Sequence, residues 1–357
     1  MSDDKIAVAM SGGVDSSVAA AILRNKGYDV TGFTVKFYTE DESFCFPSSE
    51  DLRSAEKICE ILQIPHILLD LEEAFRKKVI DYFVSDYLSG RTPNPCAICN
   101  KHIKFGILLD EAVRMGCSYL ATGHYAIICR DKKHNTVQLC RGKEHGKDQS
   151  YFLARISQRK LRKALFPVGT YTKSKIRKLA ERLDLPVSSK KESQEVCFIN
   201  NEKISEFIER YKNIKLDKGA IRNRAGEHIG THNGIAGYTI GQRKGIGVAV
   251  GKPVFVDKID KKSNEIFVGE GKDLYKDKFT GTDFMSFLDK IPENSLNVDT
   301  RIRYAHRPAS SEIIFKDNDT VEVHFKKPQR AITPGQLAVF YIKDEVVGSA
   351  WIKNVWE

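Results

Sequence analysis

The sequence predicts an α/β fold, in which a parallel sheet with flanking helices is followed by smaller β-rich units. Apolar segments at residues 5–10, 29–37 and 66–70 predict buried strands. Segments with helical spacing of apolar residues lie between or after them, at 15–26, 49–63 and 71–88. Strands that alternate with helices in this way are typical of a parallel sheet covered on both faces.

The alternation resumes after residue 100. The pattern predicts a helix at 103–115, a strand at 119–122, a hairpin at 126–140 and helices at 158–165 and 173–183. The intervening segment 90–101 is rich in proline and turn-forming residues, so we expect it to be neither helix nor strand. Thr122, Gly123 and His124 follow a predicted strand, at the edge where open α/β sheets bind ligands.

The second half of the chain is mainly β. Glycine becomes frequent beyond about residue 212, and the predicted strands are short: 254–259, 265–268, 301–304, 311–315, 320–325, 338–342 and 348–352. We therefore expect three domains, at 1–211, 212–278 and 279–357. The second is a small central β-rich domain and the third a C-terminal β-barrel.

Composition and charge narrow the class of protein. The 357 residues include 57 Lys and Arg against 47 Asp and Glu, a net charge of +10. A basic excess of this size favours a polyanionic partner larger than a nucleotide, although a basic surface that merely keeps the protein in solution would look the same. No segment approaches the ~18 apolar residues of a membrane span, and the N-terminus lacks a signal-peptide layout. We expect a cytoplasmic protein with no membrane partner.

The turn after the first strand predicts a phosphate site. Ser11, Gly12 and Gly13 lead into a helix that opens with Val14, Asp15, Ser16 and Ser17. Glycines let backbone N–H groups close around a phosphate at the positive end of a helix, and serines add hydroxyl donors. The Lys that a Walker loop needs is missing. Asp15 is either a ligand that positions metal and phosphates or a capping residue.

Three of the eight cysteines are candidates for chemistry. Cys96 and Cys99 form a C-x-x-C pair in the Pro-rich segment, and Cys197 lies in a second non-periodic segment. One interpretation is a redox set that carries sulfur through persulfide and disulfide states. The other is a metal site, with three thiolates holding an iron–sulfur cluster, or with His102 as a fourth ligand to zinc. Five cysteines are expected to be structural: Cys45, Cys59, Cys117, Cys129 and Cys140.

Ser11 to Ser17 resembles the PP-loop of enzymes that split ATP between its α and β phosphates. With seven further segments, the whole chain resembles the tRNA-specific 2-thiouridylases. Those segments are 90–95 with 99–105, 121–125, 147–153, 166–169, 197–199, 237–245 and 333–336. They span nearly the whole chain in one order. The resemblance implies a PP-loop domain, a central domain and a C-terminal β-barrel.

The resemblance also implies roles for individual residues. ATP would be bound, with Mg²⁺, by Ala9, Met10, Ser11, Gly12, Gly13, Val14, Asp15, Ser16, Val35 and Gly123. Cys99 would be the nucleophile and Cys197 the thiol that receives sulfur. The target base would face Asn94, Pro95 and Cys96. Other tRNA contacts would come from His124, Lys147, Asp148, Gln149, Arg303, Tyr304 and Gln336.

The implied reaction is ATP-dependent 2-thiolation of the wobble uridine, position 34, in the tRNAs for Lys, Glu and Gln. Uracil O2 would be adenylated and then replaced by sulfur from a donor protein or sulfide, with release of pyrophosphate and AMP. One departure from the family matters, because many members carry Asn-Pro-Asp where this chain has Asn94, Pro95 and Cys96. Members with the third cysteine are understood to use an iron–sulfur cluster. A [4Fe-4S] cluster on Cys96, Cys99 and Cys197 therefore stands beside the persulfide scheme.

Two rival functions share part of this pattern. Another PP-loop enzyme, such as a tRNA cytidine thiolase or an amide-forming ATP pyrophosphatase, would keep Ser11 to Ser17 but does not need the segment 90–105 in this form. A non-catalytic RNA-binding or redox-sensing protein would keep the fold, but it would not need an intact ATP loop.

Overall fold

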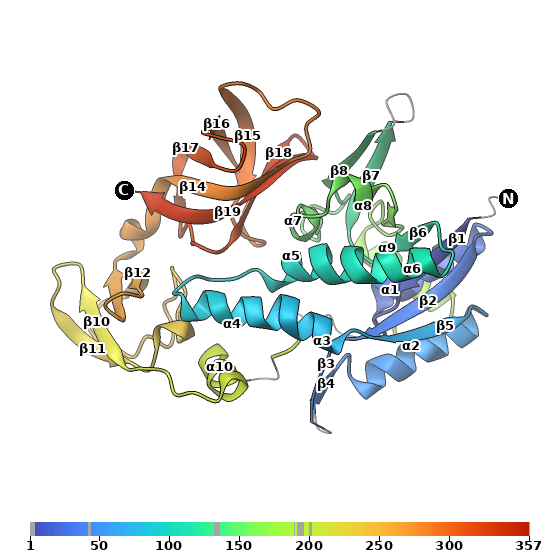
Figure 1. Cartoon of the computed structure of the whole chain (residues 1–357), viewed down its shortest axis with the longest axis horizontal. Helices are drawn as coiled ribbons and strands as arrows, with labels where there is room; N and C mark the ends of the chain where they lie inside the picture. The colour runs from blue at the N-terminus through green and yellow to red at the C-terminus, as the bar shows by residue number, and fades with distance from the viewer. Residues whose placement is uncertain are drawn as a thin grey trace. The chain divides into compact units, whose positions relative to one another are not determined.

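The computed structural model describes residues 4–41, 44–131, 136–188, 190, 196–199 and 202–356. Two compact units divide the chain. The first comprises Met1–Ile80, Cys96–Phe198 and Asp344–Val346, and the second comprises Asp81–Pro95, Ile199–Lys343 and Val347–Glu357. Figure 1 labels the helices and strands of both units.

The first unit contains a parallel sheet in the order β5-β2-β1-β6-β9. Its strands are β1 Lys5–Ala9, β2 Asp29–Lys36, β5 His66–Asp70, β6 Tyr119–Ala121 and β9 Ala164–Leu165. The unit also contains the pairs β3 Tyr38–Asp41 with β4 Phe44–Phe46 and β7 Ala126–Asp131 with β8 Thr136–Arg141. The predicted parallel sheet and the predicted hairpin are thereby confirmed.

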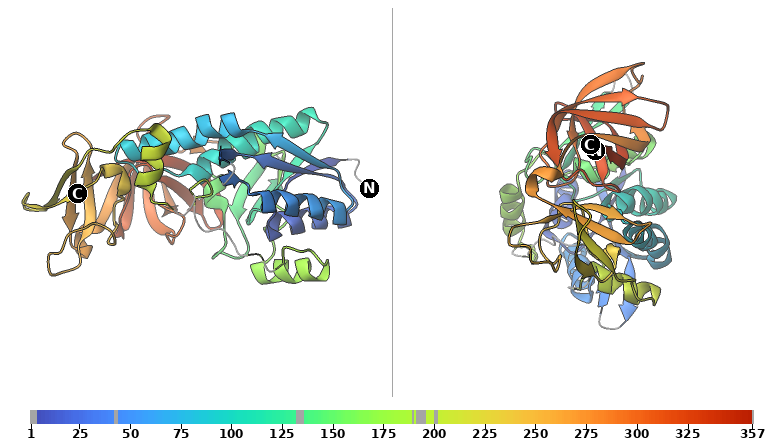
Figure 2. Two further views of the ribbon diagram at one scale, coloured as in Figure 1. Left: turned by 90° about the horizontal axis from the view of Figure 1, so that it is seen from below. Right: turned by 90° about the vertical axis from the view of Figure 1, so that its left-hand side faces the viewer.

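Helices cover both faces of this sheet, as the left view of Figure 2 shows. The helical segments are α1 Val14–Asn25, α2 Ser49–Ile61, α3 Glu72–Phe75, η1 Arg76–Ile80, α5 Pro95–Cys99, η2 Asn100–Leu108, α6 Leu109–Arg114, α7 Ser150–Leu153, α8 Gln158–Leu161 and α9 Lys173–Arg182. One core joins Ile6 and Val8 of β1 to Val18 of α1, Ile58 of α2 and Ile176 of α9. Ala7, whose side chain alternates to the other face, is also fully buried.

The second unit combines two helices with two β structures. Helix α4 Asp81–Leu88 packs on α10 Ile204–Lys212, where Phe83 and Phe207 meet edge to face at 6.1 Å. The central sheet has the order β11-β10-β13-β12, with β10 Gly219–Asn223, β11 His228–His232, β12 Phe255–Asp260 and β13 Glu265–Gly269. Short 3₁₀ turns η3 Ile235–Gly237 and η4 Gly271–Leu274 accompany it.

The remaining strands close into a barrel, as predicted. They are β14 Tyr275–Ser286, β15 Ser295–Arg301, β16 Ala309–Phe315, β17 Val321–Arg330, β18 Leu337–Ile342 and β19 Glu345–Trp356. Pairing of β14 with β19 completes the closure. Phe279, Val323, Phe340 and Ile352 fill the interior. Because β14 begins at Tyr275, this strand crosses the expected boundary at 279.

Three local predictions were wrong. The segment 90–101 becomes helical at Pro95, because proline is tolerated in the first turn, where its missing N–H has no partner to lose. The helix expected at 158–165 ends at Leu161, and Ala164–Leu165 instead pairs with β6 as an edge strand. The strand expected at 301–304 lies earlier, as β15, which ends at Arg301. Within the hairpin, residues 132–135 lie outside the described residues.

Among the residues that the structure describes, no helix combines the length and the apolar character that a membrane crossing requires.

Gly169 offers a test of this packing. A Cβ at Gly169 would lie 1.7 Å from the carbonyl oxygen of Ala126, the first residue of β7. We expect Gly169→Ala to lower the free energy of unfolding by about 1–3 kcal/mol, because backbone must move to admit the methyl group. Scanning calorimetry measures this effect. Gly146→Ala is the matched control, since a Cβ there meets nothing within 4 Å.

Candidate functional site

The phosphate loop lies at the carboxyl end of β1. Gly13 caps α1 without a side-chain hydrogen bond, so the first N–H groups of the helix stay open to a ligand. Ser16 Oγ holds the loop by accepting from Ser11 N at 3.2 Å and donating to Gly13 O at 3.1 Å. Gly12 has φ +69°, and a Cβ there would lie 2.3 Å from the carbonyl oxygen of Asp51. This turn therefore requires glycine.

A cavity of about 210 Å³ opens beside this loop at the strand ends. Its lining comes from the ends of β1, β2 and β6 and from η2: Ala9, Met10, Ser11, Ser16, Phe33, Val35, Phe37, Pro47, Lys104, Leu108, Thr122, Gly123, His124 and Gln149. β1 pairs with β2 on one side and with β6 on the other, so the strand order reverses at β1. Open α/β sheets hold ligands at the carboxyl ends of the strands at such a point.

Gly123 lets the β6 turn approach α1 closely. A Cβ at Gly123 would lie 2.6 Å from Ser16 N and 2.9 Å from Asp15 Cβ. Six of the predicted ATP contacts thus meet in one cavity: Ala9, Met10, Ser11, Ser16, Val35 and Gly123. Gly12, Gly13, Val14 and Asp15 belong to the same loop and helix start but are not part of the cavity lining.

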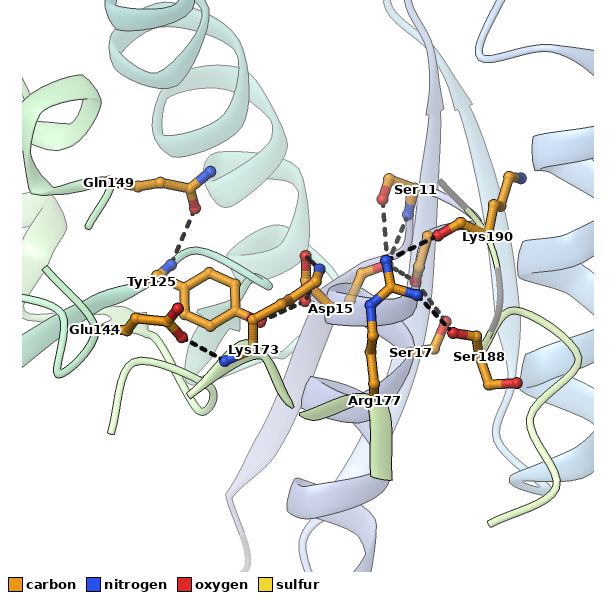
Figure 3. A network of polar contacts seen from close by, with 12 residues as sticks. Ser11, Asp15, Ser17, Tyr125, Glu144, Gln149, Lys173, Arg177, Ser188 and Lys190 are labelled. Carbon is orange, nitrogen blue, oxygen red and sulfur yellow. Dashed lines mark hydrogen bonds and ion pairs between the residues drawn. The ribbon is translucent and has the colours of Figure 1, made fainter. Parts of the chain in front are cut away.

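Asp15 is held by a network of polar contacts (Figure 3). Lys173 Nζ lies 2.8 Å from both carboxylate oxygens of Asp15, and the Tyr125 hydroxyl donates to Oδ1 at 2.7 Å. Gln149 Oε1 accepts from Tyr125 N at 3.0 Å, and Glu144 Oε2 from Lys173 N at 2.6 Å. The carboxylate of Asp15 therefore anchors α9 to the start of α1, and direct binding of a metal would have to displace Lys173.

A second ion pair, between Lys190 and Asp51, supports the loop. Figure 3 shows Lys190 and its contact with Arg177. Lys190 Nζ lies 2.5 Å from Asp51 Oδ1 and donates to the Gly12 carbonyl at 3.2 Å. Arg177 in turn donates to the carbonyls of Ser188 and Lys190. Burial opposes ionisation of Asp51, but hydrogen bonds from Lys190 and Ser48 prevail and lower its pKa.

The three candidate cysteines lie near one another in the first unit. Cys96 is exposed, whereas Cys99 and Cys197 are partly exposed. Burial raises the pKa of Cys99 to about 11, with the charge of Lys104 opposing and that of Cys96 reinforcing the shift. Burial, followed by the charges of Cys96 and Cys99, raises the pKa of Cys197 well above its usual value. These mutual effects place the three sulfurs within electrostatic reach of each other.

The cysteines do not form a metal site as they stand. Within the described part of the chain, no group of three or more His, Cys, Asp or Glu side chains is arranged to hold a metal ion. A [4Fe-4S] cluster or zinc on Cys96, Cys99 and Cys197, with or without His102, therefore stays a prediction. Cys59 and Cys117 are buried, as predicted for structural cysteines, but Cys129 on β7 is exposed.

A pH titration tests the environment of Cys99. Its raised pKa means that the thiol is protonated at neutral pH, so we expect its alkylation by iodoacetamide to accelerate about tenfold per pH unit from pH 7 to 10. Peptide mass spectrometry gives the rate at this residue. In denatured protein the profile should bend near pH 8.5, the ordinary thiol value. A bend near pH 8.5 in the native protein would contradict the buried environment.

His124 and Gln149, two predicted tRNA contacts, both line the cavity. Burial and the charge of Lys104 hold the pKa of His124 well below 6.5, so the imidazole is neutral at physiological pH. His124 Nδ1 shares a 2.7 Å hydrogen bond with Thr122 Oγ1.

The neighbouring Lys147 and Asp148 are not in the cavity lining. Asp148 is buried, and its carboxylate accepts from Gly142 N, Ser150 N and Ser150 Oγ. Any contact of Asp148 with RNA would therefore come through its backbone.

In the second unit, Gln336 fixes the loop that carries Asn94. Its Nε2 donates to the carbonyls of Pro93 at 2.8 Å and Thr92 at 3.1 Å. Thr92 N donates to Pro334 O at 2.9 Å. Asn94 is buried, and its N–H donates to the Tyr82 hydroxyl at 3.3 Å. The amide of Gln336 thus positions the predicted base-facing loop.

Arg303 and Tyr304, also in the second unit, follow the end of β15. Arg303 donates to Arg330 O at 2.9 Å and Ala331 O at 3.4 Å. The guanidinium of Arg301 lies 5.1 Å from the centre of the Tyr304 ring and also donates to the Tyr304 carbonyl. The predicted tRNA residues Arg303 and Tyr304 thus sit in an ordered turn, and their RNA contacts stay a prediction.

Exchange of Gln336 tests its effect on this loop. Gln336→Glu replaces two N–H donors with a carboxylate that faces two carbonyl oxygens, so we expect local opening to become easier by about 1–3 kcal/mol. Hydrogen exchange at Thr92 and Asn94 should accelerate accordingly. Gln63→Glu, at an exposed position outside the loop, is the control. Unchanged exchange in Gln336→Glu would contradict the anchoring role.

Sequence reasoning did not single out four side chains of the first unit: Lys104, Lys173, Lys190 and Phe33. Lys173 opens the helix predicted at 173–183, and the pairing of its charge with Asp15 depends on a contact with a residue 158 positions away in the sequence. Lys104 could have been identified from the sequence, since it lies five residues after Cys99 in one of the segments that carry the resemblance.

Comparison with family models covers most of the chain. Residues 4–201 match a model described as a tRNA methyl transferase HUP domain, residues 205–270 the corresponding PRC-barrel domain, and residues 276–352 an aminomethyltransferase β-barrel domain. The first of these matches alone covers more than half of the 357 residues.

Full-length relatives decide the family. The chain is 44% identical to tRNA-specific 2-thiouridylase MnmA 2 of Thermoanaerobacter sp. (strain X514), with 99% of this chain and 98% of the relative aligned. It belongs to the tRNA-specific 2-thiouridylase family. MnmA of Clostridium beijerinckii is 43% identical, with 98% of this chain and 99% of the relative covered. MnmA of Clostridium perfringens is 42% identical over 99% of this chain and 100% of its own.

A solved U34-tRNA thiolase NcsA from Methanococcus maripaludis with its [4Fe-4S] cluster is 20% identical, covers 59% of this chain and 68% of its own, and has a TM-score of 0.36. This similarity is too low to bear on the function of the 2-thiouridylase family member described here.

Proposed function

We propose that the chain is a tRNA-uridine 2-sulfurtransferase, which thiolates the wobble uridine at position 34 at the expense of ATP. The observation that supports this most directly is the cavity beside the phosphate loop. It is bordered by η2, whose preceding residue is Cys99, in a chain that aligns from end to end with named 2-thiouridylases. One site can therefore combine nucleotide activation with thiol chemistry.

The first half-reaction is adenylation of uracil O2. O2 attacks the α-phosphate, the bond to the β-phosphate breaks, and pyrophosphate departs. The N–H groups at the start of α1 and the hydroxyl of Ser11 would donate hydrogen bonds to phosphate oxygens. Mg²⁺, when bound with ATP, would neutralise phosphate charge. AMP attached to O2 makes that oxygen a leaving group.

The second half-reaction transfers sulfur. The terminal sulfur of a Cys197 persulfide attacks C2, and AMP departs with O2. The Cys99 thiolate then attacks the Cys197 sulfur, which forms a Cys99–Cys197 disulfide and leaves the terminal sulfur on C2. Sulfane sulfur is reduced and two thiols are oxidised, so an external thiol reductant has to restore the enzyme. In the cluster alternative, Cys96, Cys99 and Cys197 would hold the cluster, which would supply the activated sulfur.

The tRNA is the substrate of this reaction, and the basic net charge of +10 supports binding of a polyanion. We propose that the tRNAs for Lys, Glu and Gln are thiolated in the cytoplasm. A donor protein would transfer sulfane sulfur to Cys197, whereas sulfide could form the persulfide only by attacking the Cys99–Cys197 disulfide, which frees the Cys99 thiolate. The target base would meet Asn94, Pro95 and Cys96, with further contacts from His124, Lys147, Gln149, Arg303, Tyr304 and Gln336.

Reconstitution tests the activity. Purified protein, in excess over an unmodified tRNA transcript, is combined with ATP, Mg²⁺ and a sulfur-donor protein that carries a persulfide, and pyrophosphate and nucleosides are measured. We expect one 2-thiouridine, one AMP and one pyrophosphate per tRNA, all dependent on U34. Formation of 2-thiocytidine instead would favour a cytidine thiolase, and the absence of pyrophosphate release would favour a binding protein.

Single cysteine variants separate the sulfur schemes. Cys99→Ser and Cys197→Ser should abolish 2-thiouridine, because both thiols take part in the transfer. Cys96→Ser should keep at least a third of the activity, since the exposed Cys96 has no role in the disulfide step. Cys129→Ser, also exposed, is the control. Loss of activity in Cys96→Ser, together with iron and labile sulfide in anaerobic wild-type protein, would overturn the persulfide scheme in favour of a cluster.

A further inference from the structure

Lys104 lies in the wall of the cavity, on η2. The lining contains two ionisable side chains among the described residues, Lys104 and His124. Burial and the charge of Lys104 lower the pKa of His124, so this imidazole is neutral. The ammonium of Lys104 is therefore the formal charge that the cavity wall presents to an anionic ligand.

Within the described residues, the charge of Lys104 has no ion-pair partner. Lys173 is paired with Asp15 and Lys190 with Asp51, both at the edge of the same loop. Among the residues that the structure describes, Lys104 has neither an ion pair nor a hydrogen bond. Its side chain is nevertheless half-buried. Partial burial of an unpaired ammonium is unfavourable, so its retention points to a ligand of opposite charge.

The π-helical winding of η2 directs Lys104 toward Cys99. Lys104 lies five positions after Cys99, and in an α-helix of about 3.6 residues per turn it would face nearly the opposite side. In a π-helix, residue i instead bonds residue i+5, which brings such a pair onto one side. Segments of this kind are rare and are frequent at functional sites.

The electrostatic effect of Lys104 agrees with this geometry. Desolvation of the sulfur raises the pKa of all three thiols, even though Cys96 is exposed as a whole residue, and in all three the charge of Lys104 lowers the pKa. Lys104 is thus the cation that both the cavity and the thiol group share. The α-phosphate of ATP takes part in both half-reactions. It is attacked in the first, and it leaves as part of AMP in the second.

We propose that Lys104 is a further catalytic residue of the thiolation reaction, whose ammonium binds the α-phosphate of ATP and of the adenylated uridine. The proposal rests on the proposed function. When O2 attacks, electrons pass to the leaving pyrophosphate and charge grows on the α-phosphate oxygens, where the ammonium stabilises it and keeps its proton. When sulfur attacks C2, the C2–O2 bond breaks, and the same ammonium stabilises departing AMP. Lys104 thereby supplies the cation that the lysine-free phosphate loop lacks.

Lys104→Met tests the proposal, because it removes the charge and keeps most of the side-chain length. Lys104→Arg keeps the charge, and Lys57→Met, on an exposed lysine of α2 paired with Glu60, is the matched control. Three quantities are compared: tRNA-dependent pyrophosphate release at saturating ATP, 2-thiouridine formation, and the Kd of ATP. Melting curves of all variants report folding.

We expect Lys104→Met to slow pyrophosphate release and thiolation together, by about 10²–10³-fold, as loss of one transition-state donor does. The Kd of ATP should change less than tenfold, since several other groups hold the nucleotide. Lys104→Arg should recover at least a tenth of the wild-type rate, and Lys57→Met should match wild type. Lys104→Met should melt no lower than wild type, because no internal partner is lost; a purely structural lysine would lower the melting temperature.

Other outcomes overturn the assignment. Pyrophosphate release within threefold of wild type in Lys104→Met refutes a role at the α-phosphate. Normal release with lost thiolation, and alkylation of Cys99 shifted to higher pH, would assign Lys104 to the thiolate instead. Should Lys104→Met fail to fold, Lys104→Gln and Lys104→Arg carry the same comparison. A wild-type enzyme that forms no 2-thiouridine refutes the proposed function itself, which is a separate result.

Discussion

The site depends on the close approach of two turns at the carboxyl ends of β1 and β6. A side chain at Gly123 would collide with the backbone of Ser16, and one at Gly12 with the carbonyl of Asp51. Both glycines therefore allow backbone to lie where side chains would otherwise fill the space. The cavity exists because these turns flank the start of α1 without covering it.

Charge around the loop is arranged in two layers. Two lysines, Lys173 and Lys190, are neutralised by Asp15 and Asp51 and serve to hold α9 and the Lys190 segment against the loop. The remaining cation, Lys104, faces the cavity without such a partner in the described residues. The charges of Lys173 and Lys190 are thus paired before ATP binds. The ammonium of Lys104 is the positive charge that the cavity wall presents to an incoming phosphate.

Much of this was predictable from sequence because it is local. The first strand, the glycine turn and α1 follow from adjacent residues, and the barrel follows from alternating patterns in the second half. What sequence could not supply depends on distant contacts. The pairing of Lys173 with Asp15, the anchoring of Pro93 by Gln336, and the pairing of β9 with β6 each join residues far apart in the chain.

The helix at Pro95 shows a different limit. The sequence predicted a loop there because prolines and turn-forming residues dominate 90–101. A proline that opens a helix cannot be told from one that breaks a helix unless the first residue of the helix is known. The spatial relation of Cys99 and Lys104 was hidden for the same reason, because it depends on π winding rather than on spacing alone.

The division of the chain into two units carries a consequence for fragments. The backbone passes from one unit to the other after Ile80, Pro95, Phe198, Lys343 and Val346. No single cut therefore releases either unit as one continuous polypeptide. A truncation after Phe198 would leave 81–95 without most of the residues of its own unit and would remove Asp344, whose carbonyl accepts from Arg141 N. Recombination that exchanges one unit between related proteins would therefore require several coordinated breakpoints in the gene.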